Sequence, residues 1–147
     1  MENIYNFLKI SDSIATSGQP TKEQFSELKD SEYQVVVNLA LPTSANALPG
    51  EKEIVEDLGM EYIHIPVVWE NPKIEDLDRF FSVMSKNKHK KTFVHCAANM
   101  RVSAFMYLYR RLRDRVNEEE AKQDLYQIWQ PNATWQQFIE RAIEKYQ

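Results

Sequence analysis

The sequence predicts a single α/β domain over residues 1–147, with a parallel sheet of four to five strands and helices on both of its faces. Three short apolar runs support this, at 33–40, 61–68 and 92–95, spaced roughly thirty residues apart. Such runs are typical of strands that are covered on both faces. Amphipathic helical patterns lie between them, and this alternation indicates a parallel sheet. Neither a repeat nor a shift in composition divides the chain.

The first helices are predicted by the residues at their ends. Thr21 and Gln24 have the spacing of a capping box, which predicts that a short helix starts after the turn around Pro20. The stretch "EKEIVEDLG" reads as a second helix that ends at Gly59. These two helices flank the first predicted strand in the sequence.

The later helices are predicted by the spacing of their apolar residues. One helical face is formed by Ile74, Leu77, Phe80, Phe81 and Met84, and another by Val102, Phe105, Met106, Tyr109 and Leu112. Two capping-box patterns, Asn117 with Glu120 and Thr134 with Gln137, predict the starts of two C-terminal helices.

Composition excludes several classes of protein. A net charge of −4 argues against general binding of nucleic acid. No apolar run approaches the ~20 residues that span a membrane, and the start, "MENIYNFLKI", lacks the pattern of a signal peptide. We therefore expect a cytoplasmic protein, or a periplasmic one if a leader was removed. One cysteine and three scattered histidines predict neither a disulfide, nor a metal site, nor a cofactor.

The stretch "FVHCAANMRVS" places the only cysteine, Cys96, between a predicted strand and a predicted helix. Backbone amides at such a junction lack internal partners, and together with the helix dipole they form a site for an anion. Arg101 adds a planar, permanently charged fork for two phosphate oxygens. The predicted phosphate-binding residues are Ala97, Ala98, Asn99, Met100 and Arg101.

A thiolate beside a bound phosphate suits nucleophilic displacement at phosphorus. A lone cysteine is more often a small buried apolar residue, but its place in this loop favours a nucleophile, with a phosphocysteine intermediate. His95 and Ser103 are polar groups in positions to tune the thiolate. A purely structural role for His95, as a donor to a backbone carbonyl, is compatible with that tuning.

Three stretches, "VVVNLA", "YIHIPV" and "FVHCAANMRVS", occur in the order that they have in cysteine-dependent phosphatases of the dual-specificity type, and the chain resembles that superfamily. The stretch "IATSGQPTKEQFSELKDSEYQVVVNLA" is similar to a bacterial, beta-lactamase-hydrolase-like phosphatase group within it. The resemblance spans roughly Ile14 to Leu112. It implies a protein-tyrosine-phosphatase-like fold and metal-independent hydrolysis of phosphate monoesters on a phosphorylated protein or small molecule.

The Cys loop departs from the superfamily pattern, which has five residues between Cys and Arg and then Ser or Thr. Only four residues separate Cys96 from Arg101, so Val102 falls where the Arg is expected and Ser103 where the Ser or Thr is. One helix position corresponds to a rotation of about 100°, so Arg101 needs a tighter loop to reach the phosphate. Resemblance to the bacterial group implies that this short form, with Asn99 in place of a Gly, is a variant of that group.

The family also implies a general acid, usually an Asp, on the loop after the second strand. Here that loop reads "VVWENP", and no Asp occurs before Asp76 in a predicted helix. Glu70 is therefore the predicted acid. Two alternatives stay open: a phosphate- or phosphopeptide-binding module without turnover, and a sulfurtransferase that uses the same Cys loop. The sequence predicts neither the substrate nor the oligomeric state.

Overall fold

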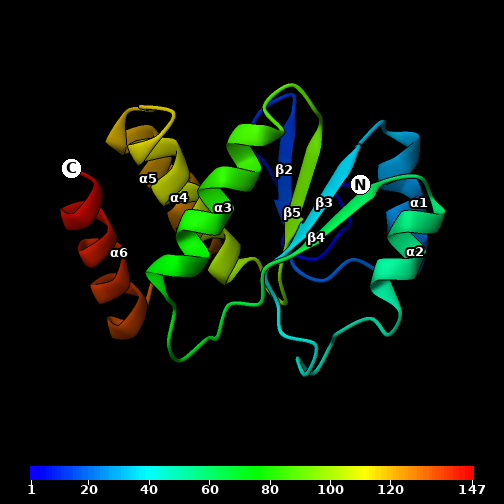
Figure 1. The fold of residues 1–147 in the computed structure, drawn as a ribbon, viewed down its shortest axis with the longest axis horizontal. Helices are drawn as coiled ribbons and strands as arrows, with labels where there is room; N and C mark the ends of the chain where they lie inside the picture. Colours follow the sequence, from blue (N-terminus) through cyan, green and yellow to red (C-terminus); the bar gives the residue numbers. More distant parts are fainter.

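The computed structural model describes residues 1–147 and contains one five-stranded sheet between two layers of helices (Figure 1). The strand order is β1-β2-β5-β3-β4. Strand β1 pairs antiparallel with β2, and the other neighbours are parallel. The strands are Leu8–Lys9, Ile14–Ser17, Val35–Asn38, Glu61–His64 and Thr92–His95. The predicted α/β class and strand number are thereby confirmed.

Helices cover the sheet unequally. Two of them, α1 (Lys22–Asp30) and α2 (Glu51–Asp57), lie on one face (Figure 1). Four lie on the other: α3 (Ile74–Lys86), α4 (Met100–Leu112), α5 (Glu118–Ile128) and α6 (Ala133–Tyr146). None of these helices combines the length and the apolar composition that crossing a bilayer requires.

Strand β3 shows why the central strands are buried on both faces. Its side chains alternate between the faces of the sheet. Val35 and Val37 belong to the 24-residue core under α3 to α6, whereas Val36 belongs to the 9-residue core under α1 and α2. Both sets are fully buried, so a polar residue on either face would be removed from water at a cost.

Helix ends agree with the sequence in three cases and differ in one. The capping box of Thr21 and Gln24 is present at α1, and Gly59 has the left-handed backbone (φ 86°) that follows a helix. Asn117 caps α5. The prediction for the last helix was wrong: its cap is Asn132, whose Oδ1 accepts from the amide of Trp135 at 3.0 Å. Asn is the stronger capping residue, so the helix begins before Thr134.

The carboxyl ends of β3, β4 and β5 meet at one edge of the sheet, the lower edge in Figure 1. Their following segments, 39–50, 65–73 and 96–99, form adjacent loops there. In parallel sheets this edge is where ligands bind. The Cys loop is therefore in the position that the sequence predicts for a functional site.

Candidate active site

The Cys loop connects β5 to α4 and carries the polar groups of the predicted phosphate site. Cys96 follows the strand directly and is 1% exposed. The amides of Ala97, Ala98, Met100 and Arg101 donate to no other protein group. Four uncommitted amide donors in one short segment at the start of a helix favour the binding of an anion.

Hydrogen-bond donors from distant segments hold the carbonyl groups of this loop. The Ala97 carbonyl accepts from the backbone amide of Gln19 and from Asn46 Nδ2, each at 3.1 Å. The Ala98 carbonyl accepts from Asn6 Nδ2 at 3.0 Å. These hydrogen bonds fix the orientation of the loop through its carbonyl groups. The N–H groups of the loop are therefore left free to bind a ligand.

Asn99 closes the shortened turn. Its φ of 65° is in the left-handed region, which Asn tolerates better than most residues that have a Cβ. The side chain is fully buried, and its Nδ2 donates to the Asn6 carbonyl at 2.9 Å and to Thr16 Oγ1 at 3.1 Å. Asn99 thus provides the backbone freedom of the Gly that it replaces and also ties the loop to β2.

Gly18 allows the end of β2 to approach the Cys loop closely. A Cβ at this position would lie 2.6 Å from Tyr5 Cδ2 and 2.8 Å from the Ala97 carbonyl oxygen. Distances below 3.0 Å require one of the neighbours to move. A residue without a side chain is therefore needed beside the loop.

Arg101 and Ser103 lie in the first turn of α4. The Arg101 side chain is buried, and its Nη1 donates to the Val67 carbonyl at 2.9 Å. The guanidinium thus extends toward the loop that follows β4 and retains further N–H donors. The Ser103 hydroxyl donates to the Met100 carbonyl at 2.8 Å, within its own helical turn.

His95 has partners on both ring nitrogens. Its Nε2 lies 2.6 Å from Glu51 Oε2, and its Nδ1 lies 3.2 Å from the Cys96 carbonyl oxygen. Burial alone would raise the pKa of Glu51, but the charge of His95 and the hydrogen bonds that the carboxylate receives outweigh burial and lower the pKa. Glu51 was not recognised from the sequence, because an acidic residue in the first turn of a helix is common.

The loop after β4 carries Glu70, the predicted general acid. Glu70 is exposed in the turn that follows Val68. Its neighbour Trp69 packs against Trp129 and Trp135, with ring centroids 5.2 and 5.9 Å away. The Trp69 carbonyl also accepts from Trp135 Nε1 at 2.9 Å. The C-terminal helices therefore hold this loop in place.

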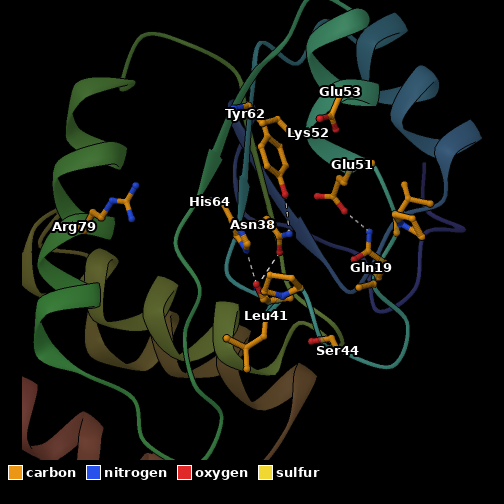
Figure 2. Close-up of a pocket in the computed structure, with 16 residues that line it drawn as sticks. Gln19, Asn38, Leu41, Ser44, Glu51, Lys52, Glu53, Tyr62, His64 and Arg79 are labelled. Atoms are coloured by element: carbon orange, nitrogen blue, oxygen red, sulfur yellow. Dashed lines mark hydrogen bonds between the residues drawn. The ribbon is translucent and has the colours of Figure 1, made fainter.

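A cavity of 740 Å³ flanks β4 and the segment that follows β3 (Figure 2). Tyr62, His64 and Arg79 line it, together with much of the segment 40–50. Cys96 and Arg101 do not line this cavity, but Gln19 and Glu51 contribute to its wall. The cavity and the surroundings of the Cys loop thus share two residues. No cluster of three or more His, Cys, Asp or Glu side chains could hold a metal ion.

Comparison with known proteins assigns the family. The family model of PTP-NADK, described as a DSP-PTPase phosphatase fused to NAD+ kinase, matches residues 8–144. The chain belongs to the DSP-PTPase phosphatase family. The resemblance of the three sequence stretches to dual-specificity phosphatases is thereby confirmed. A search of curated proteins found no match.

Solved structures of other proteins share the fold. A DUF442 protein from Shewanella putrefaciens CN-32, classed as a candidate phosphatase, is 36% identical with a TM-score of 0.88, over 99% of this chain and 95% of that one. Tk-PTP in its active form is 19% identical with a TM-score of 0.76, over 96% of this chain and 95% of that one. PTPMT1 in complex with PI(5)P is 14% identical with a TM-score of 0.81, over 96% of each chain.

The structure brings the predicted site residues together in two groups. The first comprises His95, Cys96 and the loop residues 97–101 at the end of β5. The second is the loop that carries Glu70, which Arg101 contacts through the Val67 carbonyl. The roles of these residues in catalysis remain predictions.

Proposed function

We propose that this chain is a metal-independent phosphate monoester hydrolase that uses Cys96 as its nucleophile. The observation that carries the proposal is the set of uncommitted amides in the loop that begins at Cys96 and ends at Arg101. Its structural relatives include PTPMT1 bound to PI(5)P and the PP-IP phosphatase SIW14 from S. cerevisiae. They support a phosphorylated substrate, either a protein or a small molecule.

The proposed reaction has two displacements at phosphorus. In the first, the Cys96 thiolate forms an S–P bond while the P–O bond to the leaving group breaks, and Glu70 gives its proton to the leaving oxygen. In the second, water attacks phosphorus, its proton passes to Glu70, and the S–P bond breaks to release phosphate and the thiolate. The loop amides and Arg101 bind the nonbridging oxygens throughout. Ser103 stabilises the departing thiolate by turning its hydroxyl away from Met100.

The first experiment compares hydrolysis of p-nitrophenyl phosphate by the wild type and by Cys96→Ser at pH 5 to 8, with and without EDTA. We expect activity that resists EDTA and is lost in the variant. Vanadate should also protect Cys96 of the wild type from iodoacetamide. Protection without turnover would replace the hydrolase by a phosphate-binding module. Turnover of thiosulfate in the absence of phosphatase activity would indicate a sulfurtransferase, and the absence of all three results would overturn the anion site.

The general acid is tested by two matched carboxylate variants. Asp76 lies in the first turn of α3, where partial burial raises its pKa. If Glu70 is the acid, Glu70→Gln should lower kcat for an alkyl phosphate about 100-fold, with a smaller loss for an aryl phosphate, whose leaving group needs less protonation. Asp76→Asn should leave both rates within about twofold. The reverse pattern would move the role to Asp76.

A further inference from the structure

We propose that Glu51 is a positioning residue for Cys96: it keeps His95 in the imidazolium form and holds both residues that flank the cysteine. The inference deepens the proposed function and rests on it for its catalytic consequence. Glu51 is the first residue of α2 and lies 44 positions before His95 in the sequence. No motif in the chain assigns it a role.

The contacts of His95 determine where its hydrogens lie. A carboxylate oxygen and a backbone carbonyl oxygen can only accept hydrogen bonds. Glu51 Oε2 faces Nε2 at 2.6 Å, and the Cys96 carbonyl faces Nδ1 at 3.2 Å. With a hydrogen on each ring nitrogen, both contacts are hydrogen bonds, and this form of the ring is the imidazolium. The carboxylate that balances this charge lies at Nε2, whereas Nδ1 faces the Cys96 carbonyl.

The second carboxylate oxygen of Glu51 reaches the other side of the cysteine. Glu51 Oε1 accepts from Gln19 Nε2 at 2.7 Å, and the backbone amide of Gln19 donates to the Ala97 carbonyl at 3.1 Å. Glu51 therefore holds His95 directly and Ala97 through Gln19. A single buried carboxylate fixes the chain immediately before and immediately after Cys96.

Few other charged groups face this pair. Tyr62 of β4 contributes a hydroxyl beside Glu51, and burial together with that carboxylate raises the pKa of the phenol, so Tyr62 remains neutral. From α1, the uncharged ring of Phe25 packs on His95 with centroids 5.8 Å apart. From α4, Arg101 is directed to the Val67 carbonyl. His95 itself is 0% exposed and Glu51 is 6% exposed, so solvent screens their interaction little.

A cation that hydrogen-bonds to the Cys96 backbone favours the thiolate over the thiol. Loss of the Glu51 charge would leave His95 without a counter-ion in a buried site, and a neutral ring is then favoured. Cys96 would become less reactive near neutral pH although it remains in the same loop. Glu51 thus sets the pH range in which the proposed nucleophile is available.

The test follows alkylation of the only cysteine by iodoacetamide between pH 5 and 10 in the wild type, Glu51→Gln and Glu56→Gln. Glu56 is an exposed carboxylate on the same helix and is the matched control. In Glu51→Gln the pH of half-maximal rate should rise by about one unit, whereas Glu56→Gln should leave it unchanged. Equal profiles in folded wild type and Glu51→Gln would overturn the inference.

A measurement on the wild type keeps the inference testable if Glu51→Gln fails to fold. The ¹⁵N chemical shifts of the ring nitrogens are recorded by NMR for the three histidines in ¹⁵N-histidine-labelled protein. The variants His64→Gln and His89→Gln assign the signals. His95 should show two protonated nitrogens at pH 7.5, and a neutral His95 ring would overturn the inference. Neither readout requires turnover, so failure of the proposed hydrolase leaves both results interpretable.

Discussion

Two loops at the same edge of the sheet are held by different forces. The Cys loop is fixed by polar groups, namely the Asn6, Gln19 and Asn46 donors to its carbonyls and the pair of Glu51 with His95. The loop that carries Glu70 is fixed by aromatic packing of Trp69 against Trp129 and Trp135.

The difference follows from what each loop has to do in the proposed reaction. A site for an oxyanion needs amides at fixed positions, and directional hydrogen bonds supply that accuracy. An acid on an exposed turn needs only to lie near the leaving oxygen, and nondirectional packing is sufficient for this. We therefore expect the stability of the Cys loop to depend on pH. The stability of the loop that carries Glu70 should depend on its apolar contacts.

The largest effect is expected from Trp135→Ala. Trp135 is fully buried, and its removal leaves a cavity and breaks the hydrogen bond to the Trp69 carbonyl. The free energy of unfolding should fall by about 4 kcal/mol, measured by urea denaturation. Tyr126→Ala, on the exposed face of α5, is the control and should cost less than about 0.5 kcal/mol. A loss below about 1 kcal/mol in Trp135→Ala would show that the aromatic cluster does not support this region.

Glu51→Gln should have the next largest effect on stability. Breaking a buried ion pair costs about 3 kcal/mol at pH 7. The pKa of Glu51 is lowered in the folded protein, so its contribution is present above the unfolded value of about 4.3 and is lost as pH falls through the folded value. Unfolding of both proteins is measured from pH 7 to pH 3. A difference that stays constant over this range would exclude an ionised Glu51 as its source.

Gly18→Ala tests the close approach of β2 to the Cys loop. The added Cβ would lie 2.8 Å from the Ala97 carbonyl oxygen, so the loop or Tyr5 must shift. We expect a loss of about 2 kcal/mol in the free energy of unfolding, together with lower turnover of p-nitrophenyl phosphate. Gly50→Ala is the contrast: its added Cβ would have only an ordinary contact, 3.9 Å from Glu53 Oε2, but its φ of 71° is left-handed, so its cost measures backbone strain without a steric clash. Unchanged stability and turnover in Gly18→Ala would show that the Cys loop can shift away from the added Cβ at little cost in free energy.

The smallest difference is expected between two substitutions of Asn99. Both Asn99→Ala and Asn99→Gly lose the hydrogen bonds to Asn6 and Thr16. Only Ala must also adopt the left-handed backbone with a Cβ that has no compensating polar contact. Asn99→Ala should therefore be less stable than Asn99→Gly by about 1 kcal/mol. Equal stabilities would mean that φ at this position relaxes in the variants.

Local sequence patterns predicted much of the fold. The runs around Val36 and Val94 are strands buried on both faces, as predicted, and the capping residues of α1 and α5 satisfy backbone donors locally. The run around Ile63 is also a strand, but the prediction that it is buried was wrong, because β4 lies at the edge of the sheet and its residues are exposed or half-buried. Strand β2 was not identified, because four residues carry little periodicity. Its place in the sheet comes from pairing with β5, far along the chain.

The candidate site was predicted in part. Cys96 and Arg101 share one loop and helix, so their separation is visible in the sequence. The partners of that loop are not visible, because Glu51, Asn46 and Asn6 lie 44 or more positions from the residues between His95 and Ala98 that they contact. Polar residues at these separations have no local pattern, and only the fold brings them to the Cys loop.

The aromatic cluster also has an optical consequence. Trp69, Trp129 and Trp135 are the only tryptophans in the chain, and all three lie in one cluster behind the Glu70 turn. The intrinsic tryptophan fluorescence of the protein therefore comes from this one cluster. A phosphate analogue that displaces this turn would change the spectrum of the unlabelled protein, whereas one that occupies only the Cys loop would leave it the same.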